Sequence, residues 1–162
     1  MDIERSFTVN VPLDQAWDVL ANQFHTVDTW ATGIRESKKL DAIGPAGVAN
    51  RQCDVPGFGV IQERVETFDA TQKTFSYKVV KGAPGFANHM GNTWWVKSLG
   101  PKKTEISFRL SVELKPLASF FMGWMMKRQM GKLCDEVCDD LQTYIETGSP
   151  SASKRAAVAK AA

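Results

Sequence analysis

The sequence predicts an α+β domain in which a seven-stranded curved antiparallel sheet surrounds a long C-terminal helix. Three observations support this fold: a strand-like segment begins the chain, six further alternating segments lie between residues 34 and 114, and residues 117–146 follow a helical pattern. Strands joined by such short connections pair mostly antiparallel, because a parallel crossover needs a dozen or more residues. An antiparallel sheet with one apolar face needs a cover, and the terminal helix is long enough to supply it.

The chain begins with a strand at residues 3–11, followed by two short helices. Apolar residues alternate along this segment and share one face, which is typical of a half-buried strand. Pro12 ends the strand, and the residues after it predict a helix with proline in its first turn. Residues 25–33 predict a second short helix or turn.

Six strands follow with a period of two. We expect them at about residues 34–40, 48–55, 59–68, 73–81, 88–98 and 103–114. Glycine, proline and aspartate punctuate the intervals between them, as expected for tight turns. The last strand alternates most clearly, with Ile106, Phe108 and Leu110 on one side and polar residues on the other.

The C-terminal part of the chain divides into a helix and a tail. The helical pattern ends at Gly148, a residue that commonly stops helices, and we expect the domain to span residues 1–147. Residues 148–162 are small, polar and low in complexity. We expect this basic tail to be disordered, because it cannot bury enough apolar surface to offset the entropy of ordering.

The composition excludes several classes of protein. The chain has 162 residues, 43% hydrophobic and 23% charged, which is ordinary for one soluble domain. The tail holds three of the 20 basic residues and no acid, so the remainder has 17 basic and 18 acidic residues and a net charge of −1. The expected domain is therefore not a basic nucleic-acid platform. We also expect no transmembrane helix, because no apolar run reaches about 18 residues.

The three cysteines, Cys53, Cys134 and Cys138, point to a reducing compartment. They form neither a disulfide framework nor a CxxC pair. The start of the chain also lacks the apolar stretch of a signal peptide, so we expect a cytoplasmic protein. No further cysteine or histidine completes a metal-ligand spacing, and we expect no metal, no cofactor and no covalent nucleophile.

Six short motifs occur in an informative order. They are Gly47-Val-Ala-Asn-Arg51, Val55-Pro-Gly-Phe-Gly59, Glu63-Arg64, Phe68-Asp69, Phe75-Ser-Tyr77 and Ala83-Pro-Gly-Phe-Ala-Asn88-His89. Together with the element order, they resemble the strands and loops of the SRPBCC or START-like superfamily. That group includes polyketide cyclase/dehydrase-like proteins, the birch-pollen allergen and the plant abscisic acid receptors. The resemblance covers about residues 1–147.

The resemblance implies a helix-grip fold around an apolar pocket, with its mouth between the loops at residues 55–59 and 83–88. Members of the superfamily bind lipids, hormones and polyketides, and a minority are enzymes. They share no common catalytic motif, so the resemblance leaves the activity open.

The loop centred on Gly57 predicts how its two flanking strands pair. Symmetric pairing about this loop places Arg51 opposite Glu63, on a face whose other residues are mostly apolar. Burial of such a pair costs desolvation that the attraction only just offsets. The pair is therefore either a polar anchor for a ligand carbonyl, hydroxyl or water, or a structural ion pair that pins the hairpin.

Arg35 and His89 are two further candidates. By the resemblance, Arg35 falls where the abscisic acid receptors carry a ligand-binding lysine, so it would hold a carboxylate or enolate; a solvated edge strand is the alternative. His89 lies just past the second loop, where relatives often place a tyrosine toward the ligand. A histidine side chain suits acid–base work, with a surface or hydrogen-bonding role as the alternative.

Aromatic and methionine side chains supply the remaining ligand-binding candidates. Phe58 and Phe86 each lie between glycine or proline residues in a loop, which suits residues that close a pocket mouth. Methionine adapts to irregular apolar shapes. Further candidates, each with plain core packing as the alternative, are Tyr77, Trp95, Met126 and Met130; Trp30 and Trp94 also fit a pocket.

We therefore expect the protein to bind or carry a small hydrophobic ligand, such as a lipid, polyketide or isoprenoid-like molecule. The alternative is a polyketide cyclase/dehydratase-type enzyme in the same cavity, where Arg51 or Arg35 steadies an enolate and Glu63 or His89 moves the proton. We expect a small hydrophobic molecule and no nucleic acid as partner, and a monomer or homodimer. Transient membrane contact is a further hypothesis, because residues 117–128 are apolar nearly all around; burial under the first helices is the alternative.

Overall fold

The computed structural model describes residues 1–161, and of these it leaves the side chains of residues 117–122 undescribed. Strand β1 (Asp2–Val9) leads into helix α1 (Leu13–Trp17), which runs on as a π-helical turn, η1 (Asp18–Asn22). A 3₁₀ helix, η2 (Phe24–Thr29), completes the helical segment after β1. The later elements are β2 (Glu36–Ile43), η3 (Pro45–Gly47), β3 (Ala49–Val55), β4 (Gly59–Asp69), β5 (Thr74–Lys81), β6 (Ala87–Gly100), β7 (Lys103–Leu114), α2 (Pro116–Thr147) and α3 (Ala152–Ala161).

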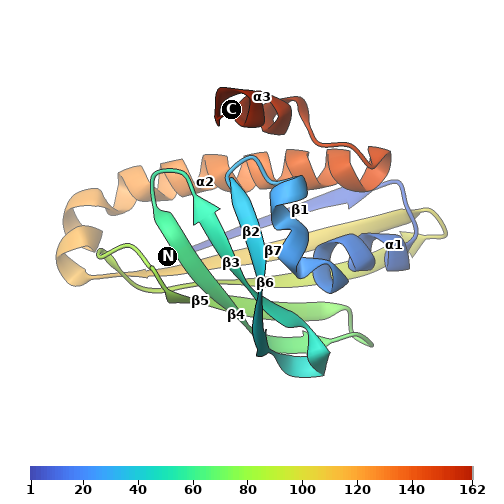
Figure 1. Cartoon of the computed structure of the whole chain (residues 1–162), viewed down its shortest axis with the longest axis horizontal. Coiled ribbons are helices and arrows are strands. Elements are labelled where there is room, and N and C mark those ends of the chain that lie inside the picture. Colours follow the sequence, from blue (N-terminus) through green and yellow to red (C-terminus); the bar gives the residue numbers. More distant parts are fainter. Residues whose placement is uncertain (162) are drawn as a thin grey trace.

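The seven strands form one antiparallel sheet in the order β1-β7-β6-β5-β4-β3-β2. The sheet curves, and α2 runs along it (Figure 1). This arrangement confirms the α+β prediction of a curved seven-stranded sheet around a long C-terminal helix. From β2 to β7, each strand pairs with the next strand in the sequence. The exception is β1, which pairs with β7, so the first and last strands of the chain lie side by side.

Helix α2 has clear local boundaries and is tied to β1. Pro116 occupies its first turn, and Gly148 ends it with a φ of 69°, a left-handed conformation that glycine adopts without strain. Arg5 of β1 forms an ion pair with Asp135 at 2.6 Å, and the backbone N–H of Asn10 donates to Glu146 at 2.7 Å. These contacts fix the helix over the β1 end of the sheet.

The short helices after β1, namely α1, η1 and η2, pack against β5 on the concave face of the sheet. Trp17 meets Phe75 of β5 edge-on, with ring centroids 5.8 Å apart, and Phe24 packs against Tyr77 at 4.8 Å. Aromatic pairs in such tilted and edge arrangements add to the stabilisation from burial. The segment that follows η2 is hydrogen-bonded to α2 through the Thr32 N–H and to β3 through the Arg35 N–H, and it contributes to a cavity wall.

The structure differs from the expected disordered tail at residues 148–162, because Ala152–Ala161 form helix α3 (Figure 1). Ser151 caps this helix: its hydroxyl accepts from the Lys154 backbone N–H at 3.0 Å and donates to the buried Asp140 carboxylate. Lys154 Nζ also donates to the Ile34 carbonyl at 2.6 Å. The composition argument counted apolar burial alone, whereas hydrogen bonds and a cap hold α3.

In the described part of the chain, no helix combines the length and apolar character that crossing a membrane requires.

Candidate functional site

A cavity of about 220 Å³ lies between the concave side of the sheet, α2 and the segment from Val27 to Ile34. On this measure one water needs only roughly 10–15 Å³, so the space suits an organic molecule rather than a single solvent molecule. Its walls are mainly apolar: the sheet contributes Ile61, Val79 and Leu110, and α2 contributes Met130 and Val137. Apolar walls with few polar groups are typical of small-molecule sites.

Two charged side chains lie among these walls, Arg51 of β3 and Glu63 of β4. They are direct cross-strand partners, which confirms the register predicted from the loop at Gly57. Arg51 Nε and Glu63 Oε2 are 2.5 Å apart, and the residues are only 5% and 7% exposed. The chain thus places a closed ion pair in a mainly apolar wall.

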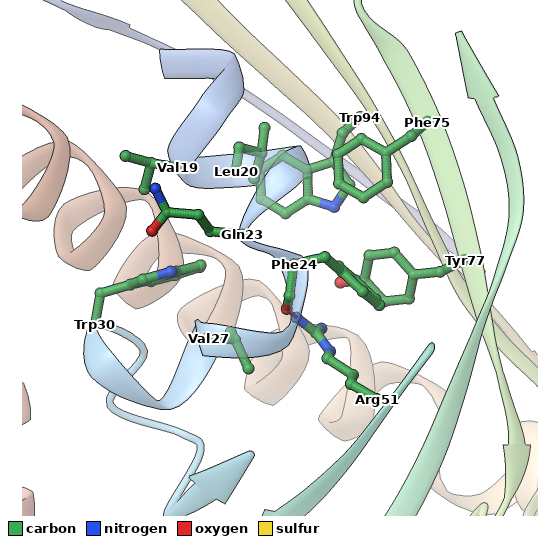
Figure 2. Close-up of a pocket in the computed structure, with 10 residues that line it drawn as sticks. All are labelled: Val19, Leu20, Gln23, Phe24, Val27, Trp30, Arg51, Phe75, Tyr77 and Trp94. Atoms are coloured by element: carbon green, nitrogen blue, oxygen red, sulfur yellow. Dashed lines mark hydrogen bonds between the residues drawn. The ribbon is translucent and has the colours of Figure 1, made fainter. Parts of the chain in front are cut away.

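Arg51 is held on several sides. Its Nη1 donates to the Phe24 carbonyl at 2.7 Å, and its guanidinium lies 3.8 Å from the centre of the Phe24 ring and 5.0 Å from that of Tyr77. Figure 2 shows the side chain reaching from β3 toward these two rings. Burial alone would lower the pKa of Arg51, but the adjacent Glu63 carboxylate raises it above its ordinary value. The arginine therefore stays protonated.

Cys53 and Tyr77 are neutral neighbours of the ion pair. Burial raises the pKa of Cys53 to about 11, and its thiol donates to Glu63 Oε2 at 3.7 Å. Burial likewise raises the pKa of Tyr77 to about 12, and its hydroxyl accepts from Asn92 Nδ2 at 3.1 Å. At neutral pH both groups act as uncharged hydrogen-bonding groups beside the pair.

A smaller hollow of about 20 Å³ adjoins the cavity on the side of η1 and η2. Figure 2 shows the side chains around it, with Gln23 at one side and Trp94 at another. Arg51 and Tyr77 line both spaces and therefore stand between them. The hollow has room for about one water molecule.

Five of the predicted binding residues line the cavity. They are Arg51, Phe58, Glu63, Tyr77 and Met130. Phe58 is 37% exposed, as expected for a residue near a mouth. Their roles toward a ligand remain predictions.

Arg35 lies away from the cavity walls. Its side chain is 56% exposed and forms an ion pair with Asp54 at 3.0 Å. It precedes β2, the last strand at that side of the sheet, so the structure agrees with the solvated alternative and corrects the binding assignment.

His89 and Trp95 also lie outside the cavity, on the opposite face of β6 from Met90, Asn92 and Trp94. Both are exposed, and the Trp95 ring packs 5.7 Å from the Arg109 guanidinium on the outer surface. The pairing of β6 with β7 shifts by one residue between Ala87 and His89, which changes the side that the later residues face. The position that the resemblance indicated for His89 therefore does not reach the cavity in this chain.

Phe86 and Met126 are likewise absent from the described cavity walls. Met126 is buried, in agreement with the core alternative, whereas Phe86 is half-buried and its carbonyl accepts from the Lys115 backbone N–H at 2.9 Å. Of the apolar stretch at residues 117–128, side chains 117–122 lie outside the described residues.

Asn92 is the polar wall residue that the sequence analysis missed. It lies two residues before Trp94 on the same face of β6, so the period of two could have found it. Asn92 Oδ1 and Trp94 Nε1 are buried and have no hydrogen-bond partner among the described residues. Buried polar atoms without partners are rare in folded proteins.

The sequence matches the model of one protein family, described as "Polyketide cyclase / dehydrase and lipid transport", over residues 1–146. No curated protein matches the chain.

Several solved structures share the fold. A START superfamily protein from Mycobacterium smegmatis has a TM-score of 0.73 and 17% identity, over 89% of this chain and 96% of that one. Norcoclaurine synthase from Thalictrum flavum, in complex with dopamine and hydroxybenzaldehyde, has a TM-score of 0.68 and 14% identity, over 90% and 86%. The di-domain ARO/CYC BexL of the BE-7585A biosynthetic pathway has a TM-score of 0.68 and 11% identity, over 89% and 47%. At these identities the likeness concerns the fold.

Proposed function

Since the chain belongs to the polyketide cyclase/dehydrase and lipid transport family, with an SRPBCC/START-like fold, we propose that it binds and carries a small hydrophobic molecule in its cavity. The observation that carries this proposal is an apolar cavity of about 220 Å³ with one buried ion pair in its wall. A lipid, polyketide or isoprenoid-like molecule fits such a lining.

The anchoring role of the ion pair rests on its unused polar atoms. Arg51 uses Nε for Glu63 and Nη1 for Phe24, and Glu63 uses Oε2. Neither Arg51 Nη2 nor Glu63 Oε1 makes a hydrogen bond to another described residue. The pair can therefore fix the hairpin and still offer Arg51 Nη2 as a donor and Glu63 Oε1 as an acceptor to a ligand.

Calorimetric titration with a panel of sterols, flavonoids, alcohols and phenols tests the proposal. We expect saturable binding that Val79→Phe weakens, because Val79 lines the cavity. Val80→Phe is the matched control, since Val80 is the next residue of β5 and is 47% exposed. Absence of binding across the panel, or equal binding to both variants, would contradict the proposal.

A cyclase/dehydratase-type enzyme is the second candidate, and the contact of both charged groups with the cavity favours it. Arg51 would stabilise a developing enolate, and Glu63 would move the proton. His89 lies outside the walls and has no part in this version. Glu63→Gln should abolish turnover of an aromatic polyketone while leaving its affinity nearly unchanged; product formation by this variant would exclude the assignment.

Transient membrane contact is a further proposal, supported by Trp124 and Met125 of α2, which are 78% and 54% exposed. Lys127 and Arg128 lie two and three residues after Met125 and would attract anionic lipid headgroups. Trp124→Glu should reduce co-sedimentation with vesicles that contain anionic lipid. Trp95→Glu, which changes an exposed tryptophan on the sheet, should not; equal losses would argue against a specific surface.

We further propose a reducing, cytoplasmic location, in keeping with the three free cysteines of the described chain.

A further inference from the structure

The ionisable groups of the cavity walls balance to zero net charge. Arg51 and Glu63 are the charged side chains among the described lining residues, and they are in contact. The other titratable wall groups are Tyr77 and Cys134. Burial raises the pKa of Tyr77 to about 12 and the pKa of Cys134 to about 11, so both are neutral at pH 7.

This balance disfavours an anionic ligand. The positive charge of Arg51 is already opposed by Glu63 at 2.5 Å, as close as a ligand carboxylate could come. A bound carboxylate would therefore add an uncompensated charge to a mainly apolar cavity and would be repelled by Glu63. Burial of an unpaired charge is among the most unfavourable changes a site can undergo.

The unused atoms of the ion pair define the polar group that fits. Arg51 Nη2 can donate and Glu63 Oε1 can accept, and both belong to one cross-strand pair. A hydroxyl group accepts one hydrogen bond and donates another, so a single hydroxyl can satisfy both atoms. A ketone or ether can satisfy only the donor.

The polar groups nearest the pair are uncharged as well. The Tyr77 ring lies 5.0 Å from the Arg51 guanidinium, and its hydroxyl is hydrogen-bonded to Asn92. Trp94, two residues further along β6, adds an indole N–H. This side of the cavity therefore presents neutral hydrogen-bonding groups around a neutralised ion pair.

We propose that the cavity selects neutral ligands bearing a hydroxyl group, namely alcohols and phenols, over carboxylates of the same size. The inference rests on the proposed binding function and names the class of ligand.

A matched series of 4-butylphenol, 4-butylanisole, butylbenzene and 4-butylbenzoate at pH 7 provides the test, with affinity measured by calorimetry. We expect the phenol to bind about tenfold more tightly than the anisole, the effect of losing one hydrogen bond to a charged group. We expect the benzoate to bind more weakly than butylbenzene. If the benzoate equals or exceeds the phenol, or the phenol equals butylbenzene, the inference is wrong although the binding function stands. If no member binds, the binding function itself fails.

Removing the negative charge should reverse the selectivity. In Glu63→Gln the shape of the side chain is kept but Arg51 loses its counter-charge, so the benzoate should now bind more tightly than the phenol. Glu66→Gln is the matched control, because Glu66 pairs with Lys78 and Arg64 on the outer surface and the variant should keep the original order. An unchanged order in Glu63→Gln would overturn the inference.

A measurement on the unmodified protein covers the case in which Glu63→Gln does not fold. Only the protonated form of 4-butylbenzoic acid should bind, so its apparent affinity should rise about tenfold per pH unit as the pH falls from about 7 to about 5. An affinity that is constant or falls over this range would contradict the selection against anions.

Discussion

At the scale of the residue, Arg51 and Glu63 determine the chemistry of the cavity. Each is almost fully buried, and each depends on the other, because an isolated charge in this position would have no compensation. Phe24 adds a carbonyl acceptor and an aromatic face to the arginine. The side chain is therefore held by contacts from two separate parts of the chain, η2 and β4.

Replacing one member of the pair should be costly. Arg51→Met leaves the Glu63 carboxylate buried without its partner, and we expect the free energy of unfolding to fall by about 3–5 kcal/mol. The double variant Arg51→Met/Glu63→Leu should be more stable than Arg51→Met alone, because it removes the unpaired charge. Denaturant unfolding measures both.

Arg64→Met is the control for the pair, since its ion pair with Glu66 is half-exposed and should contribute only about 0–1 kcal/mol. A loss in Arg51→Met no larger than in this control would show that the buried pair is not a stabilising unit.

At the scale of the element, α3 acts as a brace on a cavity wall. Asp140 of α2 accepts from the Thr32 backbone N–H at 2.7 Å and from Ser151, and Lys154 donates to the Ile34 carbonyl. Ile34 itself lines the cavity. Helix α3 is thus connected to the segment that closes the site, although none of its described residues lines the site.

Removing the cap of α3 should loosen this segment. Ser151→Ala loses the cap on the Lys154 N–H and one partner of a buried carboxylate, and we expect a loss of about 1–2 kcal/mol. Amide hydrogen exchange should become faster at Ile34. Ser153→Ala, at an exposed position of the same helix, should change neither property. Unchanged exchange at Ile34 in Ser151→Ala would refute the bracing role.

At the scale of the whole molecule, the interior is built to keep its titratable groups neutral or paired. Burial raises the pKa of Cys53 to about 11 and that of Tyr77 to about 12, above the ordinary values of 9.0 and 10.0. Both residues belong to the core that also forms the cavity wall. Their raised pKa values therefore make the free energy of unfolding depend on pH.

The sign of this linkage predicts an alkaline loss of stability. A group whose pKa is raised on folding contributes stability that is fully present below the unfolded value and is lost as pH rises through the folded value. The free energy of unfolding should accordingly fall between about pH 9 and pH 11, by roughly 2 kcal/mol for Cys53 alone.

Urea unfolding at pH 8 and pH 10.5 measures this loss, and Cys53→Ala should lose less stability over the interval than the unmodified protein. Equal losses in both proteins would assign the alkaline effect to other groups.

The sequence by itself determined the order of the seven strands and the long helix, the approximate strand positions and the pairing of Arg51 with Glu63. These features follow from local rules: the period of two along a strand, the turn residues between strands and the symmetry of a tight hairpin about Gly57. Only the tertiary structure decided which candidates reach the cavity. A one-residue shift in the β6–β7 pairing turned His89 outward, and a surface partner, Asp54, engages Arg35. It also decided that the tail folds, because Ser151 binds Asp140 of α2, 11 residues earlier, and Lys154 binds the carbonyl of Ile34, 120 residues earlier in the chain.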